Sequence, residues 1–416
     1  MKDEKVTRRT ALKTGAGAIG GMSTIGAMGA TSARGGEERA GNKEGGGSNV
    51  YESLGVKPII NAAGTITTLG GSLMPPEVVE AWRDASRHFV NLPELQDRVG
   101  ERIAGLLGVE AALVTTGAAG AITVGTAAAV THQRRNLIGK LPLPPEMGLE
   151  VIRQRSHRDC YDRQVAAAGV KLVDVDTVAD LRRRISERTV MMLAYNFEDW
   201  SKISRSEWVA IAREHHVPTL LDAAADTPPR DRLWEYSKMG FDLVIFSGGK
   251  GLRGPQDAGL LLGRKDLIEA AKLNTAPRCG TIGRGMKVSK EDMVAMVAAV
   301  ERFLRLDHDA EEREWRRRID VISAAVENLP TVKTETITPP VANHVPHLLI
   351  LWDEKRVKIT PQQVKATLSQ GDPSIVTARV HDTGEEGFLI SVFMLQPGEE
   401  KIVASRMREI LEPAAT

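Results

Sequence analysis

The sequence predicts an α/β protein. We expect a large, mainly parallel seven-stranded sheet with helices on both faces, followed by a small C-terminal α+β domain. Between about residues 75 and 263, strand-like apolar runs alternate with segments of helical period, which is typical of a parallel sheet covered by helices. Aromatic residues make up only 4% of the chain, as suits short buried strands packed between helices. A single hydrophobic core stops growing in chains of roughly 250 to 300 residues. This chain has 416 residues, so two lobes are expected.

The elements of the large sheet follow one another in a regular order. Short apolar runs predict its strands at Ala111–Thr116, Val151–Arg153, Lys171–Val175, Val190–Tyr195, Thr219–Asp222, Leu243–Phe246 and Gly259–Leu262. Apolar residues at helical spacing predict helices at Pro75–Phe89, Glu101–Leu107, Ala121–Val130, Val178–Ile185, Glu207–His215 and Asp266–Leu273.

A long helix is expected to lead out of the large domain. Ser289 stands before two acidic residues, so it suits a helix cap whose first turn complements the helix dipole. The helical period continues toward Leu329, and Pro330 ends it, which predicts one continuous helix. The remaining elements of the small domain are expected at His347–Trp352, from Thr360 and Pro361 onward, and at Ile375–Val380, Phe388–Leu395 and Glu399–Leu411.

The first 33 residues indicate an export signal. A basic segment, Thr7-Arg-Arg-Thr-Ala-Leu-Lys13, precedes a weakly apolar Gly/Ala stretch that ends in the small residues Thr31-Ser-Ala33. The paired arginines followed by Leu and Lys resemble a twin-arginine signal, which predicts recognition by the twin-arginine export machinery and a periplasmic or other extracytoplasmic location. A disordered basic tail is the alternative.

We expect four regions along the chain. Residues 1–33 form the signal, and the glycine-rich, charged residues 34–49 form a flexible linker. Residues 50–300 form the large domain with its N-terminal segment, and residues 301–416 form the linking helix and the small domain. No run in the mature region is apolar and long enough for a membrane helix, so no membrane contact is expected after signal cleavage.

Charge and cysteine content limit the classes of function. Lysine and arginine number 55 against 54 acidic residues, so no global field favours nucleic acid, and a small-molecule ligand is expected. The two cysteines, Cys160 and Cys279, lie in no metal-binding spacing, so no metal site is expected. An oxidising compartment would permit one disulfide between them, and two unreactive thiols are the alternative.

The most informative pair is Asp222 and Lys250. Each follows a short apolar run that predicts a buried parallel strand, and open α/β sheets bind ligands at the carboxyl ends of such strands. Pyridoxal phosphate needs a lysine for its aldehyde and an acid for its ring nitrogen, and this pair supplies both. The sequence therefore predicts a Schiff base between Lys250 and this cofactor. The alternative for Lys250 is a solvated loop lysine.

Further residues suit the phosphate and the ring of that cofactor. A run of small residues after the first predicted strand, including Gly117 and Ala118, opens a helix whose backbone N–H groups can hold a phosphate. Alternatively, these small residues only form a turn that lets the helix pack tightly. Ser247 would add a hydroxyl donor. His157 would stack on one ring face, unless it is an ordinary hydrogen-bonded histidine. Ala224 would pack against the other face, on the same side of the chain as Asp222.

In this order, these residues resemble the fold type I pyridoxal phosphate enzymes. Within that superfamily the chain is similar to the branch of L-seryl-tRNA(Sec) selenium transferase and D-glucosaminate-6-phosphate ammonia-lyase, over about residues 50 to 400. The motifs that carry this resemblance are Pro58-Ile-Ile-Asn-Ala-Ala-Gly-Thr, Leu92-Pro-Glu-Leu-Gln, Ser247 to Gln256, and Gly283-Arg-Gly-Met-Lys-Val-Ser-Lys-Glu. The resemblance implies an aminotransferase-like large domain, a catalytic role for Lys250 and Asp222, phosphate contacts from Gly117, Ala118 and Ser247, and a homodimer or higher homo-oligomer.

The resemblance implies a lyase that abstracts the Cα proton of an amino acid or amino-sugar acid and forms a 2-keto acid by β-elimination or ammonia release. Arg379 and Arg284 are candidates for binding the substrate carboxylate, since arginine binds such groups with two hydrogen bonds. Gln256 and Asn61 lie in family-like loops and are further candidates for substrate contact. Alternatively, the two arginines are surface charges without a ligand, and Gln256 and Asn61 only form hydrogen bonds within turns.

Other activities remain open at this stage. An aldolase, epimerase or aminotransferase would use the same site, and a selenium-transferase-like enzyme would share the family motifs. The near-zero net charge and the linker before Tyr51 disfavour a tRNA substrate. The alternative from another class is a non-catalytic exported ligand-binding protein, since a fold does not fix a function.

Overall fold

The computed structural model describes residues 49–196, 201–340, 342–379 and 387–415. The chain divides into two compact units, Met1–Gly55 and Val56–Thr416. The described part of the first unit holds the short 3₁₀ helix η1, Glu52–Leu54. The predicted export signal, and the predicted linker except for residue 49, lie outside the described residues.

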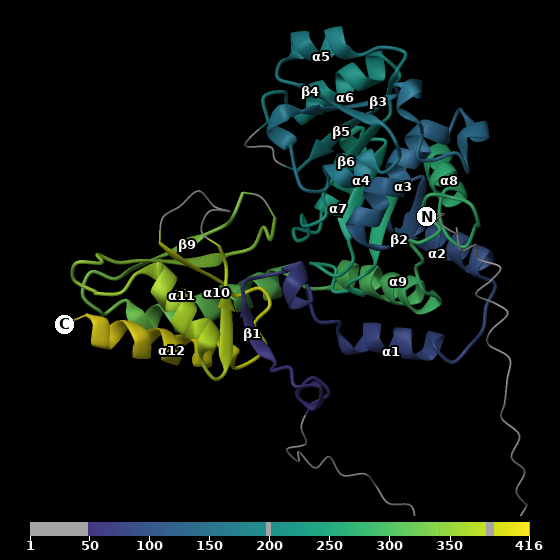
Figure 1. The fold of residues 1–416 in the computed structure, drawn as a ribbon. Coiled ribbons are helices and arrows are strands. Elements are labelled where there is room, and N and C mark those ends of the chain that lie inside the picture. The colour runs from purple at the N-terminus through teal and green to yellow at the C-terminus, as the bar shows by residue number, and fades with distance from the viewer. Residues whose placement is uncertain (1–48, 197–200, 341, 380–386, 416) are drawn as a thin grey trace, which may run out of the picture. The chain divides into compact units, whose positions relative to one another are not determined.

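In the second unit, seven strands of the described residues form one sheet in the order β2-β8-β7-β6-β5-β3-β4. Figure 1 labels five of them, β2, β3, β4, β5 and β6. Strand β8 is antiparallel to both of its neighbours, and every other pair is parallel. The strands are β2 Ala111–Thr115, β3 Glu150–Gln154, β4 Lys171–Val175, β5 Thr189–Tyr195, β6 Thr219–Asp222, β7 Leu243–Ser247 and β8 Gly259–Gly263. The predicted mainly parallel sheet is confirmed.

Helices cover both faces of this sheet. Helices α3, α4 and α8 contribute to the apolar core on one face, and α2, α6, α7 and α9 contribute to the core on the other. The α-helices are α1 Pro76–Ala85, α2 Leu92–Leu107, α3 Gly117–Thr131, α4 Asp162–Ala166, α5 Val178–Arg184, α6 Arg205–Glu214, α7 Arg232–Met239, α8 Lys265–Leu273 and α9 Lys290–Arg305. Short 3₁₀ helices are η2 Thr67–Leu69, η3 Arg135–Leu137, η4 Pro145–Met147 and η5 Arg155–His157.

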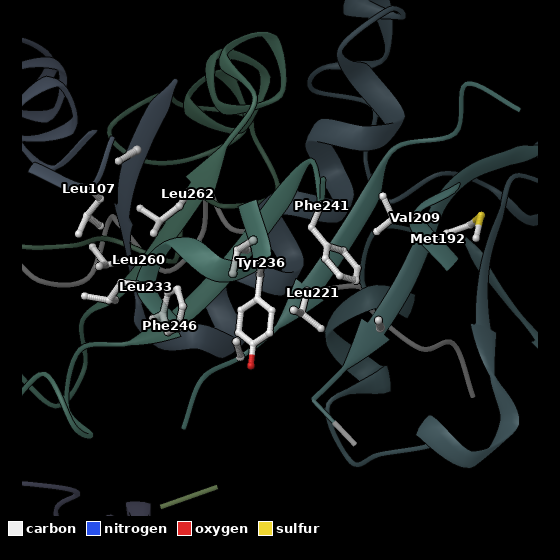
Figure 2. Close-up of a cluster of buried hydrophobic side chains, with 14 of the residues drawn as sticks. Leu107, Met192, Val209, Leu221, Leu233, Tyr236, Phe241, Phe246, Leu260 and Leu262 are labelled. Atoms are coloured by element: carbon white, nitrogen blue, oxygen red, sulfur yellow. The ribbon is translucent and has the colours of Figure 1, made fainter. Parts of the chain in front are cut away.

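The central strands β5, β6 and β7 are buried along their whole length and are mostly apolar, because both of their faces are covered. Along β6 and β7, Leu220 and Leu243 belong to one core cluster, whereas Leu221 and Val244 belong to the other. Figure 2 shows the second cluster, where Tyr236 and Phe241 lie among aliphatic side chains from the sheet and the helices. This double burial explains the unbroken apolar runs in the sequence.

The C-terminal part forms a smaller α+β assembly with its own core. Its described strands make a three-stranded antiparallel sheet in the order β12-β10-β9. A separate parallel pair joins β1 near the start of the second unit to β11, far along the sequence. The elements are β1 Ile59–Ala62, α10 His308–Val326, β9 Lys333–Ile337, β10 His347–Leu351, α11 Pro361–Gln370, β11 Ser374–Thr377, β12 Phe388–Ser391 and α12 Glu399–Ala414. The domain boundary near residue 300 stays a prediction.

Two predicted helices differ most from the structure. The prediction of a single long helix after Ser289 is wrong. The chain is extended at Leu306, and the Asp307 side chain then accepts from the Ala310 N–H, which caps a new helix. Helix α2 begins nine residues earlier than predicted, because Asn91 caps it by accepting from the Glu94 N–H.

Three further observations concern the part of the chain that is described. No helix there is both long and apolar enough to cross a membrane. No group of three or more His, Cys, Asp or Glu side chains within it is arranged to hold a metal ion. Cys160 and Cys279 are both exposed free thiols, so the alternative of a disulfide between them is not found.

Candidate active site

A pocket of about 190 Å³ lies at the carboxyl ends of β5, β6 and β7. Asp222 is the last residue of β6, and Lys250 stands three residues after the end of β7. Both line this pocket, together with residues that follow β3 and β5. The structure therefore brings together the two residues that the sequence paired, at the sheet edge where parallel α/β folds bind ligands.

Burial shifts the acid–base behaviour of both groups. Burial raises the pKa of the Asp222 carboxyl to about 6, while the Lys250 ammonium and the Ala224 N–H act in the opposite direction. Burial also lowers the pKa of Lys250, and the charge of Asp222 opposes that shift. A lysine with a lowered pKa has more of its amine in the neutral form, which is the form that attacks an aldehyde.

Glycines around Lys250 allow the chain to pack closely on both sides of it. A Cβ atom at Gly249 would lie 2.3 Å from the Gln256 Cα, and one at Gly251 would lie 1.9 Å from the Thr227 carbonyl oxygen. No larger residue fits at either position unless the backbone moves. The Ser-Gly-Gly-Lys-Gly motif thus serves to place the lysine in a tightly packed turn.

The start of α3 offers a place for a phosphate. Gly117, at φ +63°, is the first residue of the helix, and the Thr116 before it makes no side-chain capping bond. The buried Thr116 Oγ1 has no hydrogen-bond partner among the described residues. Free N–H groups at a helix start together with an unsatisfied hydroxyl suit an anion. Gly117 and the half-buried Ala118 therefore fit the predicted phosphate role.

Hydrogen bonds join Ala224 to Asp222 and Ser247 to Ala224. The Ala224 N–H donates to the Asp222 Oδ1 at 2.9 Å, and Ala224 lines the pocket. The Ser247 N–H donates to the Ala224 carbonyl at 3.1 Å, which ties the end of β7 to the turn after β6. Their predicted contacts with the ring and the phosphate stay predictions.

His157 occupies a different position from the pocket residues. It is 2% exposed, its Nδ1 accepts from the Tyr195 N–H at 3.2 Å, and its Nε2 lies 2.8 Å from the Ser201 Oγ. It is not among the residues that line the pocket, whereas Tyr161, four residues later, is. Ring stacking by His157 stays a prediction, and Tyr161 is an aromatic side chain that the sequence did not single out.

The four predicted substrate residues are not among those that line the pocket. Arg379 and Arg284 are exposed. The Gln256 side chain donates to the Thr67 carbonyl at 3.0 Å. Asn61 bonds within its own turn, where its amide donates to the Gly64 carbonyl and its oxygen accepts from the Ala63 N–H. Substrate contacts by these residues stay predictions.

Sequence reasoning missed several residues of the pocket wall. Asp159 follows β3, Asn196 directly follows β5, and Asp226 lies four residues after Asp222. Asn196 ends an apolar run just as Asp222 does, so the strand-exit argument applies to it equally. Ala342 joins the wall from a distant loop, where the N–H of the next residue, Asn343, donates to the Ala225 carbonyl.

The model of one protein family, described as L-seryl-tRNA selenium transferase (SelA), matches residues 59–338 of this sequence. The chain belongs to the L-seryl-tRNA selenium transferase family. The matched range contains both Asp222 and Lys250. Membership in this family confirms that the protein is an enzyme and confirms the predicted dependence on pyridoxal phosphate, and it sets aside the non-catalytic binding protein.

Individual relatives within and around this family differ in their reactions. D-glucosaminate-6-phosphate ammonia lyase of Salmonella typhimurium is 30% identical over 379 residues, which cover 88% of this chain and 99% of the relative. 5'-C-glycyluridine monooxygenase-decarboxylase of a Streptomyces species is 28% identical and covers 87% of this chain and 92% of the relative. L-seryl-tRNA(Sec) selenium transferase of Proteus mirabilis is 26% identical, over 59% of this chain and 56% of the relative.

Solved structures agree with the predicted fold type I architecture. The structure of D-glucosaminate-6-phosphate ammonia-lyase has a TM-score of 0.76 at 28% identity, and covers 89% of this chain and all of the other. Cysteine desulfurase from Thermococcus onnurineus NA1 has a TM-score of 0.54 at 15% identity, over 85% of this chain and 95% of its own, which shows a shared fold alone. The predicted fold class is confirmed.

Proposed function

We propose that this protein is a pyridoxal-phosphate-dependent lyase that converts a hydroxylated amino acid or amino-sugar acid into a 2-keto acid and ammonia. The observation that carries the proposal is the common pocket of Asp222 and Lys250 at the carboxyl ends of the strands. The likeness to D-glucosaminate-6-phosphate ammonia lyase supports this reaction type, since it extends over 88% of this chain and 99% of that relative.

Each residue of the site has a role that follows from its surroundings. Lys250 would hold the cofactor covalently, Asp222 would face its ring nitrogen, and the start of α3 with Ser247 would hold its phosphate. When bound, pyridoxal phosphate withdraws the electrons that are left on the substrate Cα after loss of its proton. The buried Asp222 carboxylate favours the charged ring nitrogen that this withdrawal needs.

Lys250 is the residue that moves protons in this proposal. Because burial lowers its pKa, its neutral amine can accept the Cα proton. The β-hydroxyl then leaves with its bonding electrons and takes up a proton, so water is released. The enamine product takes up water and separates into the 2-keto acid and ammonia. The overall change conserves atoms and needs no oxidant.

A substrate panel tests the proposed reaction. The purified holoenzyme is incubated with hydroxylated amino acids and amino-sugar acids in both configurations, while ammonia, keto acid and Cα deuterium exchange are measured. A lyase gives ammonia and keto acid in equal amounts. Deuterium exchange alone indicates an epimerase, aldehyde release an aldolase, and a requirement for a keto acid acceptor an aminotransferase. No product and no exchange with any member contradicts the proposal.

A selenium-transferase-like activity is the second candidate, because the family model carries that description. The chain spans only 56–64% of the length of six curated selenium transferases that it matches. It covers almost the whole ammonia lyase relative. The near-zero net charge also gives no support for tRNA binding. We therefore place the ammonia-lyase reaction first.

We also propose export and self-association. The paired arginines at positions 8 and 9 support a twin-arginine signal and hence a periplasmic or other extracytoplasmic location.

A homodimer or higher homo-oligomer is supported by large apolar side chains that are exposed in and around α1, namely Leu73, Val79, Trp82, Phe89 and Val90. Light scattering of the purified protein measures the assembly.

A further inference from the structure

The segment that continues from β1 contacts the two turns that carry Asp222 and Lys250. It comprises residues 61–71, and we call it the strap. Its first part is the motif Asn61-Ala-Ala-Gly-Thr65, which carries part of the family resemblance but contributes no residue to the lining of the pocket. Asn61 fixes the shape of this part through hydrogen bonds within its own turn. The motif therefore needs another explanation than contact with a ligand in the pocket.

At one end the strap is joined to the Asp222 turn through Asn343. The Asn343 Oδ1 accepts from the Thr65 N–H at 3.1 Å and from the Thr65 hydroxyl at 2.5 Å. The Asn343 N–H donates to the carbonyl of Ala225, three residues after Asp222, at 3.1 Å. Thr65 is only 4% exposed, so its bonds are shielded from water. Asn343 thus connects the strap to the turn that carries the acid.

The backbone at Asn343 is strained. Ala342 and Asn343 have φ values of +60° and +43°, a left-handed region that residues with side chains rarely adopt, and here two such residues are consecutive. Ala342 lines the pocket that contains Lys250. Strained backbone persists only where surrounding contacts hold it, and it occurs preferentially at functional sites. The strain therefore favours a functional role for the connection through Asn343.

At its other end the strap touches the turn that carries Lys250. The Gln256 amide donates to the Thr67 carbonyl at 3.0 Å. Gly71 has a φ of +70°, and a Cβ atom there would lie only 2.3 Å from the carbonyl oxygen of Gly249, the residue directly before Lys250. The absence of a side chain at Gly71 thus lets the strap pack directly against the lysine turn.

We propose that the strap is a positioning element that fixes the Asp222 turn and the Lys250 turn relative to each other. Asn343 anchors it at one end, and Asn61 and Gln256 act through it. The cofactor needs both turns at once, because Asp222 would face its ring nitrogen while Lys250 would bond to its aldehyde carbon. Groups that must react can lose about 100-fold when they are misplaced by about 1 Å. The inference concerns cofactor binding and does not depend on which reaction follows.

Two ligands distinguish the two ends of the strap. Pyridoxal phosphate can bond to Lys250, whereas pyridoxine 5'-phosphate has the same ring and phosphate but an alcohol in place of the aldehyde. Both are titrated into cofactor-free protein, and urea unfolding measures the stability of each variant. Gly71→Ala should weaken the binding of pyridoxal phosphate by about tenfold or more, and that of pyridoxine phosphate by less than about threefold, because it displaces the lysine turn.

Gly70→Ala is the matched control. Gly70 also has a positive φ, of +90°, but a Cβ atom there meets no other atom within 4 Å. Alanine is unfavourable for the backbone at both positions, so a difference between the variants reports the contact with Gly249. Gly70→Ala should bind both ligands as the wild type does. If Gly71→Ala does not fold, Gln256→Ala is used, which removes the bond to Thr67 and should weaken pyridoxal phosphate alone, by about threefold or more.

Thr65→Val and Thr65→Ser test the end at Asp222. Valine removes the hydroxyl that bonds to Asn343, so both ligands should bind about 3- to 10-fold more weakly, because both have a ring nitrogen that would face Asp222. Serine keeps the hydroxyl and should keep both affinities within about twofold.

Three results overturn the inference: equal losses of both ligands in Gly71→Ala, equal binding by Gly71→Ala and Gly70→Ala, or unchanged binding in Thr65→Val. If Gln256→Ala stands in for Gly71→Ala, unchanged binding or equal losses overturn it. These measurements involve no turnover, so the substrate panel tests the lyase reaction separately.

Discussion

At the scale of single residues, Asp222 makes the stability of the cofactor-free protein depend on pH. Its folded pKa of about 6 lies above the ordinary value of 3.8 because the group is buried. As the pH rises between these values, the unfolded chain loses this proton first, so the folded state becomes less stable. Asp222 contributes most to the free energy of unfolding at pH values below 3.8, its ordinary pKa. This contribution is lost as the pH rises past about 6, the pKa of Asp222 in the folded protein.

We predict that Asp222→Asn removes this dependence. In cofactor-free protein, the variant should gain stability over the wild type as the pH rises from 4 to 7, by up to about 3 kcal/mol. Urea unfolding at several pH values measures the difference. A difference that does not change with pH would contradict the assignment. The variant should also bind the cofactor less tightly than the wild type. In the wild type the Asp222 carboxylate would pair with the cationic ring nitrogen, and the asparagine amide carries no charge for that pair.

The sequence allowed this pair to be predicted because both residues stand at strand exits. Parallel strands bring their carboxyl ends to one edge, so Asp222 and Lys250 were expected to meet although 28 positions separate them. Asp159 and Tyr161 follow β3 and the three-residue helix η5, in a short segment that has no periodicity from which the direction of a side chain can be inferred. Ala342 reaches the pocket through long-range contacts, which local sequence patterns do not report.

At the scale of elements, the start of α3 depends on its contact with β8. A Cβ atom at Gly259 would lie 2.5 Å from the Gly117 carbonyl carbon and 2.8 Å from the Ala118 nitrogen. Gly259→Ala should therefore displace the helix start and weaken binding of the cofactor phosphate, by about tenfold or more. Equilibrium titration of the cofactor-free protein with pyridoxal phosphate measures the loss.

Gly105→Ala in α2 is the matched control for this prediction. A Cβ atom at Gly105 meets no other atom within 4 Å, and the residue is exposed within its helix. Alanine there should stabilise the fold by about 0.5 to 1 kcal/mol and leave cofactor affinity unchanged. Unchanged affinity in Gly259→Ala would show that this contact does not position the phosphate site.

The predicted elements were most accurate where burial on both faces produces unbroken apolar runs. All seven strands of the large sheet were expected at nearly their observed positions, and this reason applies to β5, β6, β7 and β8, which are buried at every position. The break at Asp307 was not predicted, because the helical period continues through it and only the capping bond to Ala310 shows the new start. Helix α7 was missed since its sequence, Arg-Leu-Trp-Glu-Tyr-Ser-Lys-Met, carries few apolar repeats in eight residues.

At the scale of the whole molecule, the proposed export depends on the arginine pair near the N-terminus. Replacing Arg8 and Arg9 together by lysine should retain the protein in the cytoplasm, because the export machinery reads the paired guanidinium groups. Cell fractionation of the native organism or of a bacterial host measures the distribution. Lys13→Arg keeps the pair and serves as control. Normal export of the double variant would contradict a twin-arginine signal.

The central claim is that Lys250 holds pyridoxal phosphate, and reductive trapping tests it most directly. Holoenzyme is treated with borohydride, digested and analysed by mass spectrometry, with Lys265→Ala as control. We predict a pyridoxyl label on Lys250, and an absorbance band at about 420 nm that Lys265→Ala retains and Lys250→Ala loses. A label on another lysine, or a band that persists in Lys250→Ala, would contradict the account.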